Sequence, residues 1–259
     1  MTTATLPRRA WVEQIMGLPV SIHLRGPDPD GSQARDAVAA CFAVLRHADA
    51  VFSPYRDDSD LSRWERGELA ADAADPTFAE VVALCDEARD RTGGWFDPRG
   101  LPDPRTGSPR FDPSGLVKGW AVKRAAGQLR QLRRYSWCLN AGGDILVHAE
   151  AEHPAWRVGI EDPDDPQRLL QVLERRDGAV ATSGTARRGR HILDPYTRRP
   201  ADAVRSVTVT GPDLLWADVY ATAAAARGPR SLHWLETLDG HAALLVSASG
   251  LRQVTIGWP

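Results

Sequence analysis

An acid, a tight Ser-Gly turn and a lysine lie within seven residues in the stretch FDPSGLVKGWAVKRAAGQLRQL, residues 111–132. Asp112 precedes the turn, Lys118 follows it, and apolar residues then recur at helical spacing as far as Leu132. The pattern predicts a loop that leads into a helix. Because the first N–H groups of a helix are unpaired and favour an anion, phosphate is the ligand to expect at this end. The alternative is a surface helix capped by Asp112 or Ser114, with Lys118 in solvent.

A carboxylate and a hydroxyl four residues apart mark the alanine-rich stretch 214–227. Asp218 and Thr222 fall on one face of the predicted helix, one turn apart. Oxygen ligands among small residues suit Mg²⁺, a hard cation that shares its shell with water and substrate phosphates. The pair is equally compatible with an acid favoured by the helix dipole and a threonine bonded to a backbone carbonyl.

Two further stretches combine small residues with polar side chains. Residues 140–144 read NAGGD, and two glycines inside a predicted strand require the backbone to bend or to approach something closely. Ser183 ends another strand, and His191 begins the segment HILDP after an arginine-rich run. A serine with a histidine and an acid suggests a hydrolase, but Ser183 lacks the G-x-S-x-G context. His191 is equally compatible with a structural histidine bonded to the backbone.

Helices and consecutive strands must position these residues. Apolar periodicity predicts helices over 32–52, 76–92 and within 111–132. The alanine-rich stretch 214–227 is also expected to be a helix, as is 231–238. Two strands within 10–25 join at Met16-Gly17, and further strands are expected over 137–149, 156–163, 169–184 with a turn at 177–178, 204–212, and a closing hairpin of 241–248 with 252–258. Consecutive strands outnumber βαβ alternation, so we expect an α+β fold with mainly antiparallel sheets and packed helices. The order of elements also allows two closely joined lobes with a cleft between them.

The composition is that of an ordinary globular chain. Of 259 residues, 42% are apolar and 25% charged, and the net charge is −2 without a long basic run, which disfavours nucleic-acid binding. Three cysteines, far apart in the sequence, fit reduced core thiols better than a disulfide frame. No window reaches transmembrane length, and the N-terminus has no apolar signal region, so we expect a cytoplasmic protein with no membrane insertion.

Nine stretches, in order along nearly the whole chain, resemble motifs of the ApbE family of flavin transferases, the FAD:protein FMN transferases. They are Met16-Gly17, FSPYRDDSDLSR, TGGWFDP, FDPSGLVKGWAVKRAA, LNAGGDI, WRVGIEDP, ATSG, HILDP and SVTVTGPDLLWADVYAT. One such motif is a weak signal, whereas nine in order are a strong one. The resemblance implies a single ApbE-like flavin transferase domain over residues 1–259.

The resemblance also implies the residues of the site. Those expected to contact FAD are Met16, Tyr55, Trp95, Phe96, Asp97, Asp112, Lys118, His191 and Ile192. Those expected to hold Mg²⁺ are Asp218, Thr222 and the backbone carbonyl of Gly115. Both sets agree with the anion-binding helix end and with the oxygen pair inferred from the residues alone.

A reaction is implied as well. A threonine hydroxyl of an acceptor protein attacks the FMN phosphorus of FAD, forms a phosphoester and releases AMP, while Mg²⁺ neutralises charge. Asp218 and His191 are the expected catalytic residues, with His191 or a carboxylate near the metal assisting the proton. Two alternatives stay open, namely hydrolysis of FAD to FMN and AMP by water, and a non-catalytic FAD-binding protein.

The chain departs from the family pattern at several positions. Pro113 replaces the usual Leu, Trp64 stands where Asn is frequent, and Lys123 occupies the position of an Asp. The segment TARRGR between ATSG and HILDP is short, arginine-rich and lacks the usual Tyr. That last change affects the expected contacts with the acceptor and leaves the metal pair untouched.

Overall fold

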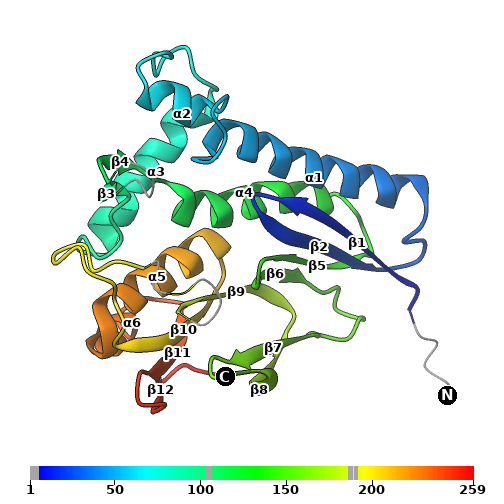
Figure 1. Cartoon of the computed structure of the whole chain (residues 1–259). Coiled ribbons are helices and arrows are strands. Elements are labelled where there is room, and N and C mark those ends of the chain that lie inside the picture. Colours follow the sequence, from blue (N-terminus) through cyan, green and yellow to red (C-terminus); the bar gives the residue numbers. More distant parts are fainter. Residues whose placement is uncertain (1–5, 103–106, 186–188, 190–191) are drawn as a thin grey trace.

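An eight-stranded antiparallel sheet is the frame of the molecule (Figure 1). The computed structural model describes residues 6–102, 107–185, 189 and 192–259. In spatial order the strands are β1 (Arg8–Ile15), β2 (Leu18–Arg25), β5 (Ser136–Ala141), β6 (Asp144–His148), β9 (Asp177–Gly184), β10 (Val204–Gly211), β11 (Ala242–Ser247) and β12 (Arg252–Val254). Each neighbouring pair is antiparallel. The expected α+β class with a mainly antiparallel sheet is therefore confirmed, as is the closing hairpin.

The strand predicted over 137–149 is in fact a hairpin of β5 and β6. Gly142 and Gly143 both have positive φ, +63° and +106°, which a two-residue hairpin turn requires and which glycine adopts without strain. The expected pairing of 169–184 with itself is wrong. Strand β8 (Asp165–Arg175) pairs with β7 (Trp156–Asp162), whereas β9 joins the large sheet. A third sheet consists of β3 (Arg99–Pro102) and β4 (Pro109–Phe111).

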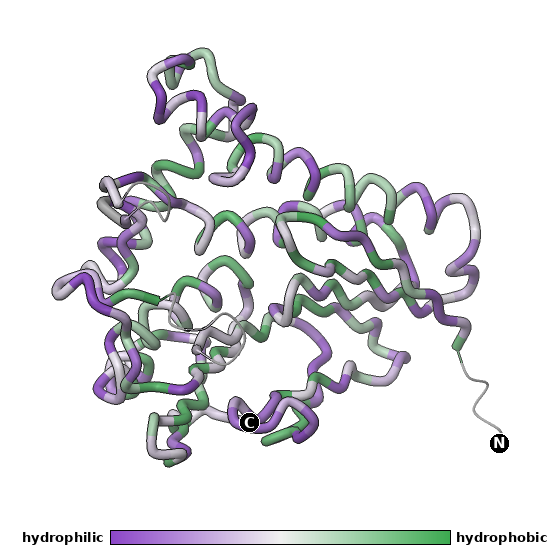
Figure 2. Tube along the Cα trace, in the orientation of Figure 1, coloured by the Kyte–Doolittle hydropathy of each residue, from purple (hydrophilic) through white to green (hydrophobic). Residues whose placement is uncertain are grey.

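Three long helices cover one face of the large sheet. They are α1 (Ser32–Phe52), α4 (Ser114–Leu129) and α5 (Leu214–Arg227), and α4 lies between the other two (Figure 1). Figure 2 shows hydrophobic and hydrophilic segments alternating along α1, as expected of an amphipathic helix. The other helices are α2 (Asp60–Glu65), α3 (Thr77–Arg91) and α6 (Ser231–Leu235), with a 3-10 turn at Gly228–Arg230. No helix in the described part of the chain has both the length and the apolar character needed to span a bilayer.

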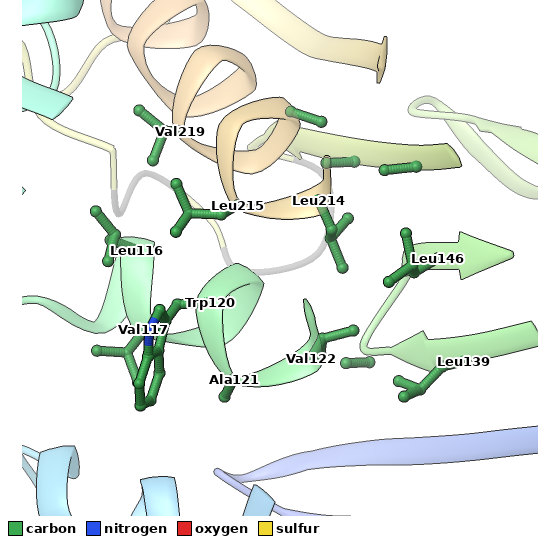
Figure 3. Close-up of a cluster of buried hydrophobic side chains, with 14 of the residues drawn as sticks. Leu116, Val117, Trp120, Ala121, Val122, Leu139, Leu146, Leu214, Leu215 and Val219 are labelled. Atoms are coloured by element: carbon green, nitrogen blue, oxygen red, sulfur yellow. The ribbon is translucent and has the colours of Figure 1, made fainter. Parts of the chain in front are cut away.

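Helices α4 and α5 approach each other closely at Gly119. A Cβ atom at this position would lie 2.9 Å from Leu215 Cα and 3.0 Å from Leu214 O. One turn earlier, Leu116 of α4 lies beside Leu215, below Val219 of α5 (Figure 3). The buried face of α5 is mostly alanine, which also permits close packing. This crossing sets the second turn of α4 beside the first turn of α5.

The β7–β8 hairpin covers the opposite face of the large sheet. Val180 of β9 belongs to a small buried cluster beneath this hairpin, whereas its neighbours Ala179 and Ala181 belong to the cluster under the helices. Such alternation is what a strand buried on both faces requires. The guanidinium group of Arg25 stacks on Trp156, with Cζ 3.5 Å from the ring centroid, and ties the hairpin to β2.

The three cysteines are free thiols. Cys41 and Cys85 are buried and Cys138 is half-buried. Burial raises the pKa of each thiol to about 12. The expectation of core thiols without a disulfide frame is confirmed.

Candidate active site

A half-buried lysine joins buried carboxylates from two other elements. Nζ of Lys118, on α4, lies 3.4 Å from Oδ2 of Asp218, on α5, and forms a salt bridge with Oδ2 of Asp144, at the start of β6. The side chains of both acids are 2% exposed and that of the lysine is 19% exposed. Because buried charges persist only when they are paired, this network holds three elements together. Lys118 does not lie in solvent, so the interpretation of 111–132 as a plain surface helix is wrong at this residue.

Asp144 is a residue of this site that the sequence interpretation did not assign. It follows the Gly142-Gly143 turn directly, and its Oδ1 accepts a hydrogen bond of 3.0 Å from the backbone N–H of Thr182 on β9. The turn and this bond fix the carboxylate beneath Lys118. The sequence signal that could have identified Asp144 is its position directly after the glycine pair of NAGGD.

The hydroxyl of Thr222 lies one helical turn after Asp218 on α5. Its Oγ1 is 2.9 Å from Ser183 Oγ at the end of β9. Asp218 and Thr222 therefore share one face of α5, as predicted, and this face is turned toward β9. Ser183 shares its hydrogen bond with a threonine, which gives the hydrolase interpretation no support.

The carboxylates of both Phe-Asp-Pro turns bond to the protein itself. Oδ1 of Asp112 accepts from the Ser114 backbone N–H at 3.0 Å, and Oδ2 pairs with Arg110 at 2.5 Å. Oδ2 of Asp97 accepts from Arg89 Nε at 3.1 Å. Asp112 thus accepts from the first N–H of α4. The N-cap residue itself is Pro113, so the expected cap by Asp112 or Ser114 is wrong. Contact of either carboxylate with a nucleotide stays a prediction.

The turn 95–97 touches the beginning of α4 through Phe96. This side chain is 5% exposed, and a Cβ atom at Gly115 would lie 3.2 Å from its ring. Trp95 packs edge-on against Tyr196, with ring centroids 4.9 Å apart, and the Tyr196 hydroxyl donates to Gly93 O at 2.6 Å. Residues expected to contact FAD and the carbonyl expected to bind the metal are therefore neighbours here.

The other expected FAD contacts lie on separate segments. Met16 occupies the β1–β2 turn with φ +54° and is partly buried against the core. Tyr55 is 82% exposed on the loop after α1, and Ile192 is 7% exposed. His191 lies outside the described residues. The contact of these four residues with FAD stays a prediction.

The donors implied for Mg²⁺ are all oxygen atoms, from Asp218, Thr222 and the Gly115 carbonyl. Within the described ranges, no group of three or more His, Cys, Asp and Glu side chains could hold a metal ion by itself. A partial oxygen set is nevertheless how proteins usually bind Mg²⁺, with water and phosphate oxygens completing the shell. The buried Asp218 carboxylate already faces one cation, the Lys118 ammonium group. The residues present therefore fit Mg²⁺ shared with a phosphate-bearing ligand.

A buried ammonium group and hard oxygen donors, held by helices over an antiparallel sheet, define a site suited to phosphates and cations. The model of the ApbE family matches residues 16–102 and 103–245. The chain belongs to the ApbE family.

Relatives and solved structures agree with this assignment. The chain is 28% identical to the FAD:protein FMN transferase of Salmonella typhimurium over 172 residues, 62% of this chain and 48% of that protein. It is 25% identical to the enzyme of that name from Haemophilus influenzae over 240 residues, 70% and 69% of the two chains. The match thus spans about half the length of the Salmonella protein.

Two solved structures share the fold. The ApbE protein of Thermotoga maritima superposes with a TM-score of 0.83 at 20% identity, over 96% of this chain and 97% of that one. The flavin transferase ApbE from Vibrio cholerae gives 0.81 at 22% identity, over 97% and 98%.

Proposed function

We propose that this chain moves FMN from FAD onto a threonine hydroxyl of an acceptor protein, with Mg²⁺, and releases AMP. The observation that carries the proposal is the buried network of Lys118, Asp144 and Asp218, because it joins three stretches that resemble the family's motifs. The names of the Salmonella and Haemophilus relatives support the same reaction.

The proposed roles follow from where the side chains lie. Lys118 would contact a phosphate oxygen of FAD, and Asp112 would order the first turn of α4 through Ser114. Asp218, Thr222 and the Gly115 carbonyl would hold Mg²⁺, which when bound neutralises charge on the phosphate oxygens. The remaining contacts with FAD would come from Met16, Tyr55, the 95–97 turn, His191 and Ile192.

The reaction balances without further reactants. The threonine oxygen of the acceptor forms a bond to the FMN phosphorus while the bond from that phosphorus to the bridging oxygen breaks. AMP leaves with the bridging oxygen, and the threonine proton passes to a base, which we assign to His191 or to a carboxylate near the metal. Phosphoryl transfer depends mostly on positioning and electrostatics, so few dedicated side chains are needed.

The partners in this proposal are FAD and an acceptor protein that carries the target threonine. The proposed compartment is the cytoplasm, since three free cysteines fit a reducing environment. The acceptor can be found by co-expression with candidate proteins, followed by mass spectrometry for FMN added to a threonine.

An isosteric substitution tests the role of Asp218. Asp218→Asn keeps the size of the side chain but removes a charged oxygen ligand, so we expect FMN transfer to fall by roughly 100-fold or more. The measurement is FMN added to the acceptor and AMP released, at limiting Mg²⁺. Asp213→Asn is the matched control. It is the same substitution on the N-cap residue of α5, and asparagine can still cap the helix, so FMN transfer should not change. Unchanged transfer by Asp218→Asn would exclude the metal role.

The same assay separates the two alternatives. AMP released at the same rate with and without acceptor would identify an FAD pyrophosphatase. FAD that stays bound and intact, with no AMP released, would identify a flavin carrier. Either result contradicts the transferase proposal.

A further inference from the structure

A hollow lined by basic side chains lies at the C-terminal end of α4. Its volume is about 410 Å³, and its lining residues are Arg130, Leu132, Arg133, Arg134, His148 and Glu150. Arg130 is the C-cap residue of α4, directly after Leu129 and twelve positions after Lys118. At 1.5 Å per residue this is about 18 Å along the helix axis. The hollow is therefore separate from the candidate active site.

Positive charge in the hollow exceeds negative charge, because three arginines and one acid line it. Arg130, Arg133 and Arg134 are exposed, and in the described part of the chain none of their guanidinium groups forms an ion pair. The one acid of the lining, Glu150, accepts a hydrogen bond of 2.9 Å from the backbone N–H of Arg134. The helix dipole favours a cation at the end of α4 and so accounts for Arg130, but its effect falls off beyond the last turn. Arg133 and Arg134 need another explanation.

A buried indole N–H next to two of the lining residues also lacks an acceptor. Trp137 is fully buried between two lining residues, with Arg130 Cζ 5.5 Å and the His148 ring centroid 5.8 Å from its ring centroid. Its Nε1 has no hydrogen-bond partner among the residues described. An indole N–H can only donate, so what this part of the molecule lacks is an acceptor oxygen. Asp177 orients His148 through a contact of 2.6 Å from Oδ1 to Nδ1.

We propose that this hollow binds a small, multiply charged oxyanion of the diphosphate kind. Arginine recognises phosphate through paired N–H donors, and three guanidinium groups against the single carboxylate of Glu150 would hold several phosphate oxygens. A volume of about 410 Å³ lies within the range of small-ligand sites. The proposal does not depend on FMN transfer, because none of the hollow's residues belongs to the candidate active site.

Titration calorimetry with inorganic diphosphate tests the proposal. The full chain is saturated with FAD and kept free of Mg²⁺, so that the candidate active site is already filled and inactive. We expect one diphosphate to bind per chain, about tenfold or more weakly in Arg130→Gln and in Arg133→Gln, since each substitution removes charge-assisted hydrogen bonds.

Arg124→Gln is the matched control. Arg124 lies on the same helix, with Cζ 5.5 Å from the Trp120 ring, the same distance that separates Arg130 from Trp137. It pairs with Glu80 rather than facing the hollow, so diphosphate binding should not change. Unfolding midpoints measured without ligand check that every variant is folded.

Three results would overturn the proposal. The first is equal diphosphate binding by the wild-type chain, Arg130→Gln and Arg133→Gln, and the second is no binding by the wild type. The third is loss of binding in Lys118→Met with full binding in Arg133→Gln, which would place the diphosphate at the candidate active site. Citrate serves as a parallel probe, and tighter binding of citrate than of diphosphate would contradict the phosphate assignment.

Discussion

At the scale of single residues, one ammonium group sets the geometry of the candidate site. Lys118 lies between two buried carboxylates, from the β5–β6 turn and from the middle of α5. Removing one partner from a buried charge network costs more than the network contributes, because the remaining charges stay buried without compensation. The site is therefore sensitive to the loss of this one side chain.

We expect Lys118→Met to lower the free energy of unfolding by about 3 kcal/mol at neutral pH, since two buried acids lose their cation. Urea denaturation at pH 7 measures the change. Lys123→Met is the control, because Lys123 pairs with Asp213 at the surface with 53% of its side chain exposed. Such exposed pairs contribute less than about 1 kcal/mol. Equal effects of the two substitutions would show that the Lys118 network does not stabilise the fold.

The sequence indicates some of these residues and not others, for a physical reason. Asp218 and Thr222 are four apart on a helix, so a local period places them on one face. Asp144 reaches Lys118 only because a hairpin turns the chain at Gly142-Gly143, and a single turn of two glycines was interpreted as a bend within one strand. A contact between residues far apart in the sequence, such as Asp144 and Lys118, produces no periodic pattern in the sequence that could predict it.

At the scale of elements, the α4–α5 crossing depends on a residue without a side chain. A methyl group at Gly119 would meet the backbone of α5 at 2.9 Å, closer than real Cβ atoms come. By contrast, a methyl group at Gly127, eight residues later on α4, would meet nothing within 4 Å. Gly119 and Gly127, two of the three glycines of α4, therefore differ in what they do for the fold.

Gly119→Ala should push the two helices apart and destabilise the protein by about 1–3 kcal/mol. Gly127→Ala should instead stabilise it by about 0.5–1 kcal/mol, because alanine loses less backbone entropy in a helix. Thermal unfolding of both variants provides the measurement. We expect the unfolding midpoint to fall in Gly119→Ala and to rise in Gly127→Ala. An equal fall in both variants would show that the close approach of α4 and α5 is not the cause.

Secondary structure was predictable where the signal is local. Helical periodicity located α1 and α4. Alanine content located α5, which is buried on nearly all sides and has no single apolar stripe. Strand partners were harder, since β2 pairs with β5 across more than a hundred residues and β8 leaves the large sheet for its own hairpin. The hollow was not predictable at all, because arginines after α4 meet a histidine of β6 only in the folded chain.

At the scale of the whole molecule, the core has two parts, one on each face of the large sheet. The three cysteines lie on three different elements, α1, α3 and β5. The thiolate is the reactive form, and burial raises each pKa to about 12. The rate at which each cysteine is alkylated therefore measures how often the structure around that cysteine unfolds.

We expect iodoacetamide to label none of the cysteines at pH 8 on the timescale of minutes and to label all three in urea. Mass spectrometry of the intact chain counts the labels. The raised pKa values favour the neutral thiols of the folded chain, so the free energy of unfolding should fall as the pH rises above about 9 toward 12. Rapid labelling of a thiol in the native protein would contradict its burial.

The sheet has two ends, at β1 and β12, and each carries an obstacle to joining another chain. Strand β12 is three residues long, too short to template a partner, and begins with an arginine. Strand β1 begins with Arg8 and Arg9, and Glu13 further along is tied to Arg46 of α1. The charged side chains of β1 and the short length of β12 therefore disfavour the addition of a strand from another copy of the chain.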